Sequence, residues 1–177
     1  VAIRGESGSG KSVTARSILQ IVDTPGRIVA GRILLHRHRT QRGQGHGKTN
    51  DDTIDLASLA PRSDAIRAIR GRDIAMIFQE PMSSLSPVHT IGNQIGEVIR
   101  LHEHVSKKAA KARSIELLRQ VEIPTPEIAV DRYTFEFSGG MRQRAMIAMA
   151  LACNPSVLIA DEPTTALDVT TQAEILS

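Results

Sequence analysis

Cysteine and aromatic residues are scarce in this chain, which has one cysteine, no tryptophan, one tyrosine and three phenylalanines among 177 residues. Cys153 therefore cannot form an internal disulfide, and its position at the end of an apolar helical run predicts a buried, inert thiol. The few aromatic rings cannot form a platform on which nucleic-acid bases stack. These shortages argue for a reducing cytoplasm and against a nucleic-acid partner.

Long hydrophobic runs are also missing. The longest candidate, residues 145–153, is far shorter than the roughly 20 residues that cross a bilayer as a helix. No signal peptide is visible at the N-terminus. The composition, 41% hydrophobic and 23% charged, is sufficient for one domain with a buried core. Val1 begins inside an expected strand and Ser177 lies inside an expected helix, so we expect a fragment of a longer protein.

The charge balance is basic, with a net charge of +3 and a pI of about 9.4. Positive charge suggests nucleic-acid binding in general. Here, however, it gathers in a Gly- and His-containing stretch, and we interpret residues 36–53 as a solvated basic loop. A metal site in this stretch is a weaker hypothesis, because its histidines have neither the spacing nor the ligand set of a recognised site.

Residues 5–12 read GESGSGKS, which is the phosphate-loop pattern G-x-x-x-x-G-K-[ST]. Glycines let such a loop turn its N–H groups toward anionic oxygens, and the helix that follows adds its dipole. The alternative, a Gly/Ser-rich linker, would not follow an expected strand at residues 1–3 or precede an expected helix at 13–22. We expect phosphate or Mg²⁺ contacts from Gly5, Ser7, Gly8, Ser9, Gly10, Lys11 and Ser12.

Residues 157–162 read VLIADE, an apolar run that ends in two acids. Four consecutive apolar residues predict a strand buried on both faces of a parallel sheet. Asp161 would then hold Mg²⁺ together with Ser12, and Glu162 would polarise an attacking water. The alternative is an ordinary polar strand exit, which the phosphate loop upstream disfavours.

The remaining pattern alternates strands with helices. It predicts a strand at 74–78, helical segments between residues 90 and 122 that end at the prolines of 124–126, a helix at 141–153, and a last helix from about residue 169. This order predicts an α/β fold with a mostly parallel sheet and an inserted helical part.

A second anion site is predicted where Ser138, Gly139 and Gly140 open a helix. Because one nucleotide needs one phosphate loop, an additional anion site suggests a nucleotide held between two subunits. An ordinary serine-capped helix is the alternative.

Together these motifs resemble the nucleotide-binding domain of ATP-binding-cassette (ABC) proteins, which are P-loop NTPases. GESGSGKS is similar to their Walker A motif, FSGGM to the signature, VLIADE to Walker B, Gln79 to the Q-loop and residues 166–168 to the D-loop. The stretches IFQEPMSSLSP, SGGMRQRAMIAMALACNP and LIADEPTTALDVT resemble more narrowly the ATPases of bacterial dipeptide, oligopeptide, nickel and glutathione importers. In the signature, Phe137 and Met141 replace the commoner Leu and Gln, although Met is frequent in peptide importers. The chain departs from the importer pattern in Thr134-Phe135, where Pro-His is usual, and in Ser86, where Asn is usual.

The resemblance implies how the chain is divided. Residues 1–88 and 132–177 would be parts of the RecA-like core, and residues 89–131 a helical subdomain leading into the signature at 137–141, with both ends of the domain truncated. ATP and Mg²⁺ are the implied cofactors. Gln79 would sense the γ-phosphate and its Mg²⁺, Glu162 would be the general base, Ser138, Gly139 and Gly140 would contact nucleotide on the opposite subunit, and Asp168 would cross the dimer interface.

The implied function is an ATP-hydrolysing motor that powers peptide uptake, bound to the cytoplasmic face of the bacterial inner membrane. Its implied partners are a second ATPase subunit, permease subunits that contact the Q-loop region and, indirectly, a periplasmic solute-binding protein. A soluble ABC ATPase acting on nucleic acid or ribosomes is one alternative, although the stretch from Lys11 to Ser138 has no sustained heptads. A degenerate regulatory domain is another, against which the intact Lys11, Asp161 and Glu162 argue.

Overall fold

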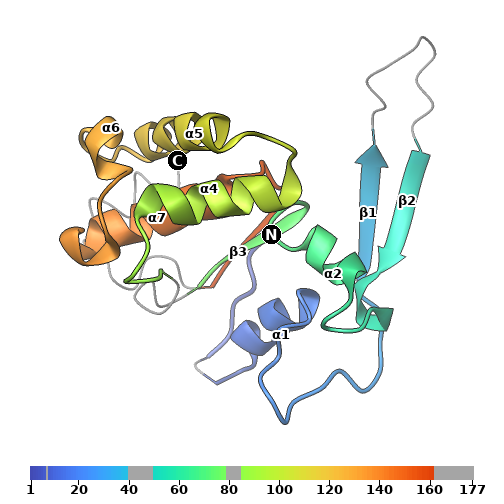
Figure 1. Ribbon diagram of the computed structural model, residues 1–177. Coiled ribbons are helices and arrows are strands. Elements are labelled where there is room, and N and C mark those ends of the chain that lie inside the picture. Colours follow the sequence, from blue (N-terminus) through green and yellow to red (C-terminus); the bar gives the residue numbers. More distant parts are fainter. Residues whose placement is uncertain (7, 40–49, 79–84, 162–177) are drawn as a thin grey trace. The chain divides into compact units, whose positions relative to one another are not determined.

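The computed structural model describes residues 1–6, 8–39, 50–78 and 85–161 (Figure 1). Contacts divide the chain into two compact units, Val1–Arg67 and Ala68–Ser177. Among their described residues, the first unit holds helix α1 and a β-hairpin, and the second holds a parallel strand pair with four α-helices. Helix α2, Asp64–Ile69, spans the boundary between them. The predicted last helix and the D-loop lie outside the described residues.

Helix α1, Lys11–Ile18, follows the phosphate loop and ends before the predicted position near Val22. Gln20 adopts a positive φ of 55° and its N–H donates to the Ser17 carbonyl at 3.1 Å, while the N–H of Ile21 donates to Arg16 at 3.0 Å. These two bonds form a Schellman motif, which satisfies the last helical carbonyls and turns the chain away. The predicted helix is therefore confirmed but is shorter at its C-terminal end.

A β-hairpin occupies part of the stretch that we interpreted as a loop. Strand β1, Leu34–Arg39, pairs antiparallel with β2, Asn50–Asp55, from Leu34 opposite Asp55 to Arg39 opposite Asn50. The loop interpretation is thus wrong for residues 36–39 and 50–53, whereas residues 40–49 lie outside the described part of the chain. A two-stranded sheet has little buried surface, so its strands need no apolar alternation, and the polar sequence concealed them. Opposite charges also face each other across the pair at Arg37 and Asp52.

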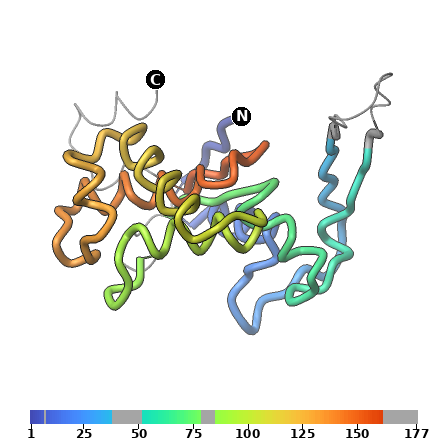
Figure 2. The backbone as a smooth tube through the Cα atoms, turned by 45° about the horizontal axis from the view of Figure 1, so that its top comes forward, coloured from blue at the N-terminus to red at the C-terminus, as the bar shows by residue number. Residues whose placement is uncertain are grey.

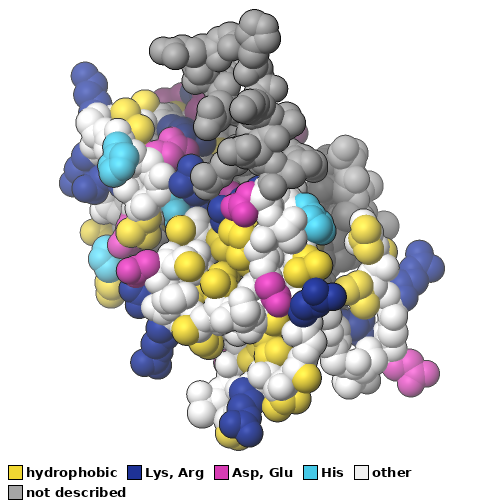
Figure 3. All heavy atoms as spheres, turned by 90° about the vertical axis from the view of Figure 1, so that its right-hand side faces the viewer, with side chains coloured by type: hydrophobic (Ala, Val, Ile, Leu, Met, Phe, Trp, Pro, Cys, Tyr) yellow, Lys and Arg dark blue, Asp and Glu magenta, His cyan; other side chains and the backbone are white. Residues whose placement is uncertain are grey.

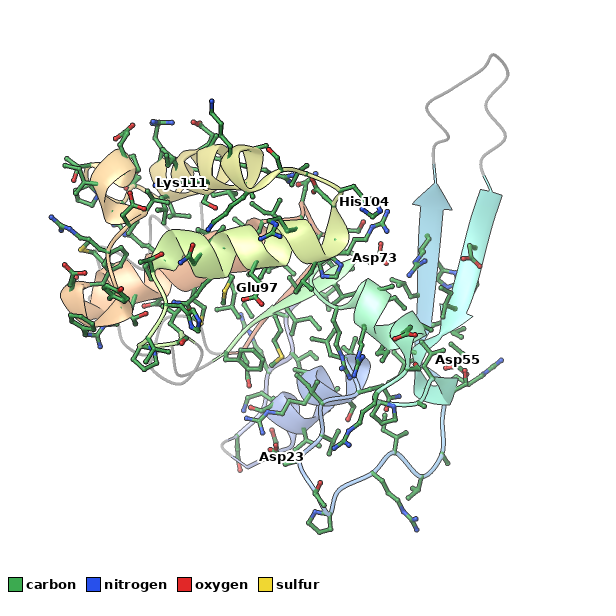
Figure 4. All side chains as sticks on the ribbon, viewed as in Figure 1. Asp23, Asp55, Asp73, Glu97, His104 and Lys111 are labelled. Carbon is green, nitrogen blue, oxygen red and sulfur yellow. The ribbon has the colours of Figure 1, made fainter. Side chains whose placement is uncertain are left out.

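The hairpin continues directly into the short 3₁₀ helix η1, Leu56–Ser58. The Asp55 carboxylate, labelled in Figure 4, accepts hydrogen bonds from the N–H groups of Ala57 at 3.1 Å and Ile33 at 3.0 Å. The Gln20 amide donates to the Leu56 carbonyl at 2.7 Å, which ties the end of α1 to η1. These contacts order the first unit around the buried side chain of Leu56.

The predicted strand at residues 1–3 is not formed. Val1 and Ile3 are exposed, and within the described residues no strand pairs with this segment. A strand forms only where a neighbour completes its backbone hydrogen bonds, so an apolar run alone does not create one.

In the second unit, β3, Ile74–Ile77, pairs parallel with β4, Val157–Ala160, so that Ile74 lies opposite Val157. Both strands were predicted, and β3 is buried throughout as expected. Strand β4 is not buried on both faces, because Val157 and Leu158 are 41% and 42% exposed. Among the described residues β4 has β3 as its one paired neighbour, which leaves its other edge and part of its surface uncovered.

The described part of the second unit also holds four α-helices, whose arrangement around the strand pair can be followed in Figures 1 and 2. They are α4, Ile91–His102, α5, Lys107–Gln120, the short α6, Pro126–Ala129, and α7, Gly139–Leu151. α4 packs against α5, and α7 contacts α4, α5 and β3. Pro126 does not simply break the helical region, because it begins α6, where its fixed φ suits the first turn. The fully buried side chains of the core include Ile91, Ile95, Ile99, Leu118 and Val130.

The close approach of α4 to Val130 gives a first prediction. A Cβ at Gly92 would lie 2.3 Å from Val130 Cγ2 and 2.7 Å from the Val130 carbonyl oxygen. Because a backbone atom cannot move aside cheaply, Gly92→Ala should lower the free energy of unfolding by about 2–3 kcal/mol. Denaturant unfolding followed by circular dichroism measures this change.

Gly96, one turn further along α4, is the matched control. A Cβ there would meet Ala110 and Ser114 at 3.7 Å, an ordinary van der Waals contact. Gly96→Ala should therefore stabilise the protein, by up to about 1 kcal/mol, because alanine is the better helix former. Equal effects of the two substitutions would contradict the packing described for α4.

Candidate nucleotide site

The backbone of the phosphate loop turns tightly at its glycines. Gly8 and Gly10 have φ of 80° and 88°, left-handed conformations that glycine adopts without strain. A Cβ at Gly5 would lie only 2.6 Å from Ser9 Oγ, so a larger residue there would force the Ser9 side chain to move. Ser7 lies outside the described residues. The backbone conformation thus favours glycine at Gly8 and Gly10.

Lys11 folds back over the loop. Its Nζ donates to the carbonyl oxygens of Gly5 and Glu6, each at 2.9 Å, and the Ser9 N–H donates to Glu6 at 3.2 Å. The ammonium group is thereby fixed above the loop and next to the first turn of α1. The predicted contact of Lys11 with the β- and γ-phosphates stays a prediction.

A phosphate group fits this arrangement. The N–H groups of the first turn of α1 have no helical acceptor, and the helix dipole places partial positive charge there. Gly10 caps the helix without a side chain, so nothing covers those donors from within the cap. Lys11 adds a full positive charge, and the half-buried Ser12 carries a hydroxyl of the kind that ligates Mg²⁺ in such loops. Lys11 and the loop N–H groups would hold the phosphates, and Ser12 the metal.

Asp161 directly follows β4. Its N–H donates to the Ile77 carbonyl at 3.0 Å, which extends the parallel pairing, and the residue is buried at 8% exposure. A buried carboxylate at the end of a strand suits Mg²⁺, which prefers oxygen ligands. Ser12 belongs to the first unit and Asp161 to the second, so their shared metal site stays a prediction. Glu162, Gln79 and Asp168 lie outside the described residues.

The start of α7 is a serine-capped helix N-terminus. Ser138 Oγ accepts the N–H of Met141 at 3.3 Å, which is the capped helix considered as the alternative for this motif. A cap does not exclude an anion site, because it satisfies only one of the first-turn N–H groups. Apart from the neighbouring backbone of α7 itself, no atom of the described residues lies within 4 Å of a Cβ built at Gly139 or Gly140. The beginning of α7 is therefore open to a ligand or a partner chain.

Cys153 is half-buried rather than fully buried. Desolvation is the main cause that raises the pKa of its thiol, and the nearby Glu103 raises it further. Its Sγ lies 3.7 Å from the Val98 carbonyl oxygen, to which the thiol donates. A thiol that is protonated at neutral pH is a poor nucleophile, so the cysteine has no evident chemical role.

The sequence analysis assigned no role to several buried polar residues, two of which lie close together. Gln94 and Thr134 are 9% and 6% exposed and hydrogen-bond to the segment around Ser86. The available signal was weak: a glutamine beside the apolar positions of α4, and a threonine where the resembling importers usually have proline.

The family model described as ABC transporter matches residues 1–165. The chain belongs to the ABC transporter family. A peptide import ATP-binding protein of Brucella melitensis is 54% identical over 177 residues, which is 99% of this chain and 48% of that protein. The glutathione import ATP-binding protein GsiA of Salmonella choleraesuis is 52% identical over 178 residues, 99% of this chain and 26% of its own length.

The chain thus spans about half the length of the first relative and about a quarter of the second. Among solved structures, the ATP-binding cassette MJ0796, in a dimeric post-hydrolysis state bound to ADP and Pi, is similar with a TM-score of 0.75 and 28% identity. That match covers 97% of this chain and 64% of the other. The predicted α/β P-loop NTPase fold of an ABC domain is confirmed by these matches.

No helix in the described part of the chain is long and apolar enough to cross a membrane.

Proposed function

We propose that this chain is part of the ATP-binding and ATP-hydrolysing subunit of an importer for peptides of the dipeptide, oligopeptide or glutathione type. The observation that carries the proposal is identity of 52–54% to peptide and glutathione import ATP-binding proteins across 99% of the chain. The phosphate loop supports it, because its wound backbone and the Lys11 ammonium suit a nucleoside triphosphate.

In this mechanism the chain's own residues orient ATP and its Mg²⁺ and position the attacking water. Lys11 and the N–H groups at the start of α1 would bind the β- and γ-phosphates, and Ser12 and Asp161 would hold Mg²⁺. Glu162 would take a proton from the attacking water, and Gln79 would contact the γ-phosphate and its metal. ATP supplies the phosphoryl group whose transfer to water drives transport.

A second cassette would complete the site. The open N-terminus of α7 supports this proposal, since Ser138, Gly139 and Gly140 would contact nucleotide on the opposite subunit while Asp168 crosses the interface. The solved MJ0796 cassette is dimeric. The further partners would be permease subunits, contacted near Gln79, and indirectly a periplasmic binding protein. The complex would lie at the cytoplasmic face of the inner membrane.

The surface does not favour nucleic acid as the partner. On the face that Figure 3 shows, the described Lys and Arg side chains stand apart from one another, with other side chains between them. Several described arginines and lysines are also paired with acids, such as Arg16 with Asp23 at 2.5 Å and Lys111 with Asp131 at 2.7 Å. Phosphate-backbone binding relies instead on cations grouped along one groove or helix.

Reconstitution tests the function. The full-length protein, assembled with its permease subunits in liposomes, should hydrolyse ATP faster when the binding protein delivers a dipeptide or glutathione. A binding protein loaded with no peptide is the control. Stimulation by DNA or ribosomes with no response to peptide would instead favour the soluble ATPase alternative. An absence of ATP hydrolysis under every condition would overturn the motor assignment itself.

A further inference from the structure

Two buried polar side chains connect the segment that follows the Q-loop to the helix that begins at the signature. The segment Leu85–His89 emerges shortly after Gln79 and leads into α4, whereas α7 begins after Ser138. Gln94 on α4 and Thr134 in the 3₁₀ helix η2, Thr134–Glu136, lie between them. All of the residues that carry this connection belong to the second unit.

Both the oxygen and the nitrogen of the Gln94 side-chain amide hydrogen-bond to the backbone of the Leu85–His89 segment. Its Oε1 accepts the Ser86 N–H at 2.8 Å, and its Nε2 donates to the carbonyls of Ser86 and His89, both at 3.0 Å. The amide therefore fixes the backbone of this segment at both ends. At 9% exposure, water can replace these bonds only in part.

Thr134 carries the connection onward. Its hydroxyl donates to the Ser86 carbonyl at 2.9 Å and lies 3.4 Å from Gln94 Nε2. Its carbonyl accepts from Arg142 Nε on α7 at 2.9 Å. A continuous path of hydrogen bonds thus runs from Ser86 through Thr134 to Arg142 in the first turns of α7. Ser86 and Thr134 are 48 positions apart in the sequence, and Thr134 and Arg142 are 8 positions apart.

The neighbouring backbone supports the same connection. Thr90 and Tyr133 form an isolated antiparallel bridge, and the Ile91 N–H donates to the Arg132 carbonyl at 2.9 Å. The segment before α4 and the segment before α7 therefore move together unless these bonds break. Displacing one segment would tilt the start of α7 through Arg142.

We propose that Gln94 and Thr134 are positioning residues that couple the segment after Gln79 to the signature at the start of α7. A displacement of that segment would shift Ser138 and Gly140 relative to the nucleotide of the opposite subunit. This inference rests on the proposed motor function. Both side chains are buried and bonded to protein groups outside the phosphate loop, so their effect is on the rate of hydrolysis in the closed dimer and not on ATP binding by that loop.

The test replaces the hydroxyl without changing the shape of the side chain. In the full-length protein assembled with its permease in liposomes, Thr134→Val should lower the kcat of peptide-stimulated ATP hydrolysis about tenfold, the effect of one lost buried hydrogen bond. KM for ATP should stay near the wild-type value. Thr134→Ser keeps the hydroxyl and should restore kcat.

Thr90→Val is the matched control, because Thr90 Oγ1 only caps α4 by accepting the Asn93 N–H at 3.3 Å. This substitution removes a hydroxyl close to Gln94 in the sequence but leaves the hydrogen bonds from Ser86 through Thr134 to Arg142 intact. The kcat should therefore change little. Thermal unfolding of each variant shows whether the fold is kept. If Thr134→Val unfolds, Gln94→Glu replaces it, since a carboxylate cannot donate to Ser86 and should likewise lower kcat.

Three results would overturn the coupling. One is an unchanged kcat in folded Thr134→Val and Gln94→Glu. Another is an equal loss in Thr134→Ser and Thr134→Val, which would show that shape and not the hydroxyl matters. The third is an equal loss in Thr90→Val, which would indicate general loosening of α4. If the wild-type protein hydrolyses no ATP in this assay, the proposed motor function fails instead.

Discussion

Replacing Lys11 with alanine should lower ATP hydrolysis by at least about 100-fold, the usual cost of removing one preorganised donor from the charge that develops in a transition state. The ammonium group lies 2.9 Å from the carbonyls of Gly5 and Glu6, so it is already fixed over the loop. Alanine removes the positive charge and both loop contacts. ATP affinity should therefore fall as well, since the ground-state phosphates lose a charge-assisted partner.

ATP turnover in the assembled transporter measures this effect, with fluorescent-nucleotide binding as the second readout. Lys107→Ala is the control, because Lys107 is an exposed lysine at the first residue of α5. It removes an equal charge and should leave turnover unchanged. Circular dichroism confirms that both variants fold. Near-normal turnover of Lys11→Ala would show that residues 5–12 are not the phosphate loop of this enzyme.

The elements that the sequence predicted correctly carry local signals. The run IAMI predicts a strand buried on both faces, and β3 is one. Apolar residues at helical spacing predict α4 and α5, and Ser138 before two glycines predicts the capped start of α7. In each case the information lies within a few residues, so no distant partner has to be known.

The errors concern elements whose state depends on distant neighbours. The hairpin of β1 and β2 has a polar sequence, because a two-stranded sheet leaves its residues largely in contact with solvent. The apolar β4 has an exposed edge because β3 pairs with it on one side. The hydroxyl of Thr134 bonds to Ser86, 48 residues away, and no periodicity reveals such a contact.

The features of the candidate site also fall into those that a local motif predicts and those that depend on distant elements. The glycine conformations, the Lys11 contacts and the cap at Ser138 follow from motifs read along a few residues. The expected sharing of Mg²⁺ by Ser12 and Asp161, by contrast, depends on how separate elements come together, and it was inferred from the arrangement that P-loop NTPases use. Local chemistry therefore predicts what each motif can bind, and the family relation predicts which motifs act on one nucleotide.

The second large expected effect is a loss of ATP hydrolysis when the open start of α7 is altered. Gly140→Asp should abolish hydrolysis while leaving the monomer folded. Apart from the neighbouring backbone of α7 itself, no atom of the described residues lies within 4 Å of a Cβ at this position, and an acid in the first turn stabilises a helix by about 0.5 kcal/mol through its dipole. Against a γ-phosphate about 4 Å away, however, the carboxylate would be repelled by about 4 kcal/mol in a partly buried site.

Gly140→Asn separates charge from size. The amide has nearly the same shape but no charge, so it should reduce hydrolysis much less than the carboxylate does. ATP should still bind each Gly140→Asp monomer with near-normal affinity through its own phosphate loop. Thermal unfolding and nucleotide binding check the monomer, and size exclusion with ATP checks closure of the dimer. Equal loss of activity in the two variants would assign the effect to crowding.

A mixed dimer then decides whether the start of α7 acts on its own nucleotide or on its partner's. One subunit carries Gly140→Asp and the other carries Lys11→Ala. If α7 completes the opposite site, both lesions fall on the same composite site and the other site keeps an intact phosphate loop and an intact signature. Vanadate trapping should then capture one nucleotide per dimer. Two inactive sites would mean that each α7 serves its own subunit, because only then would each lesion disable a different site.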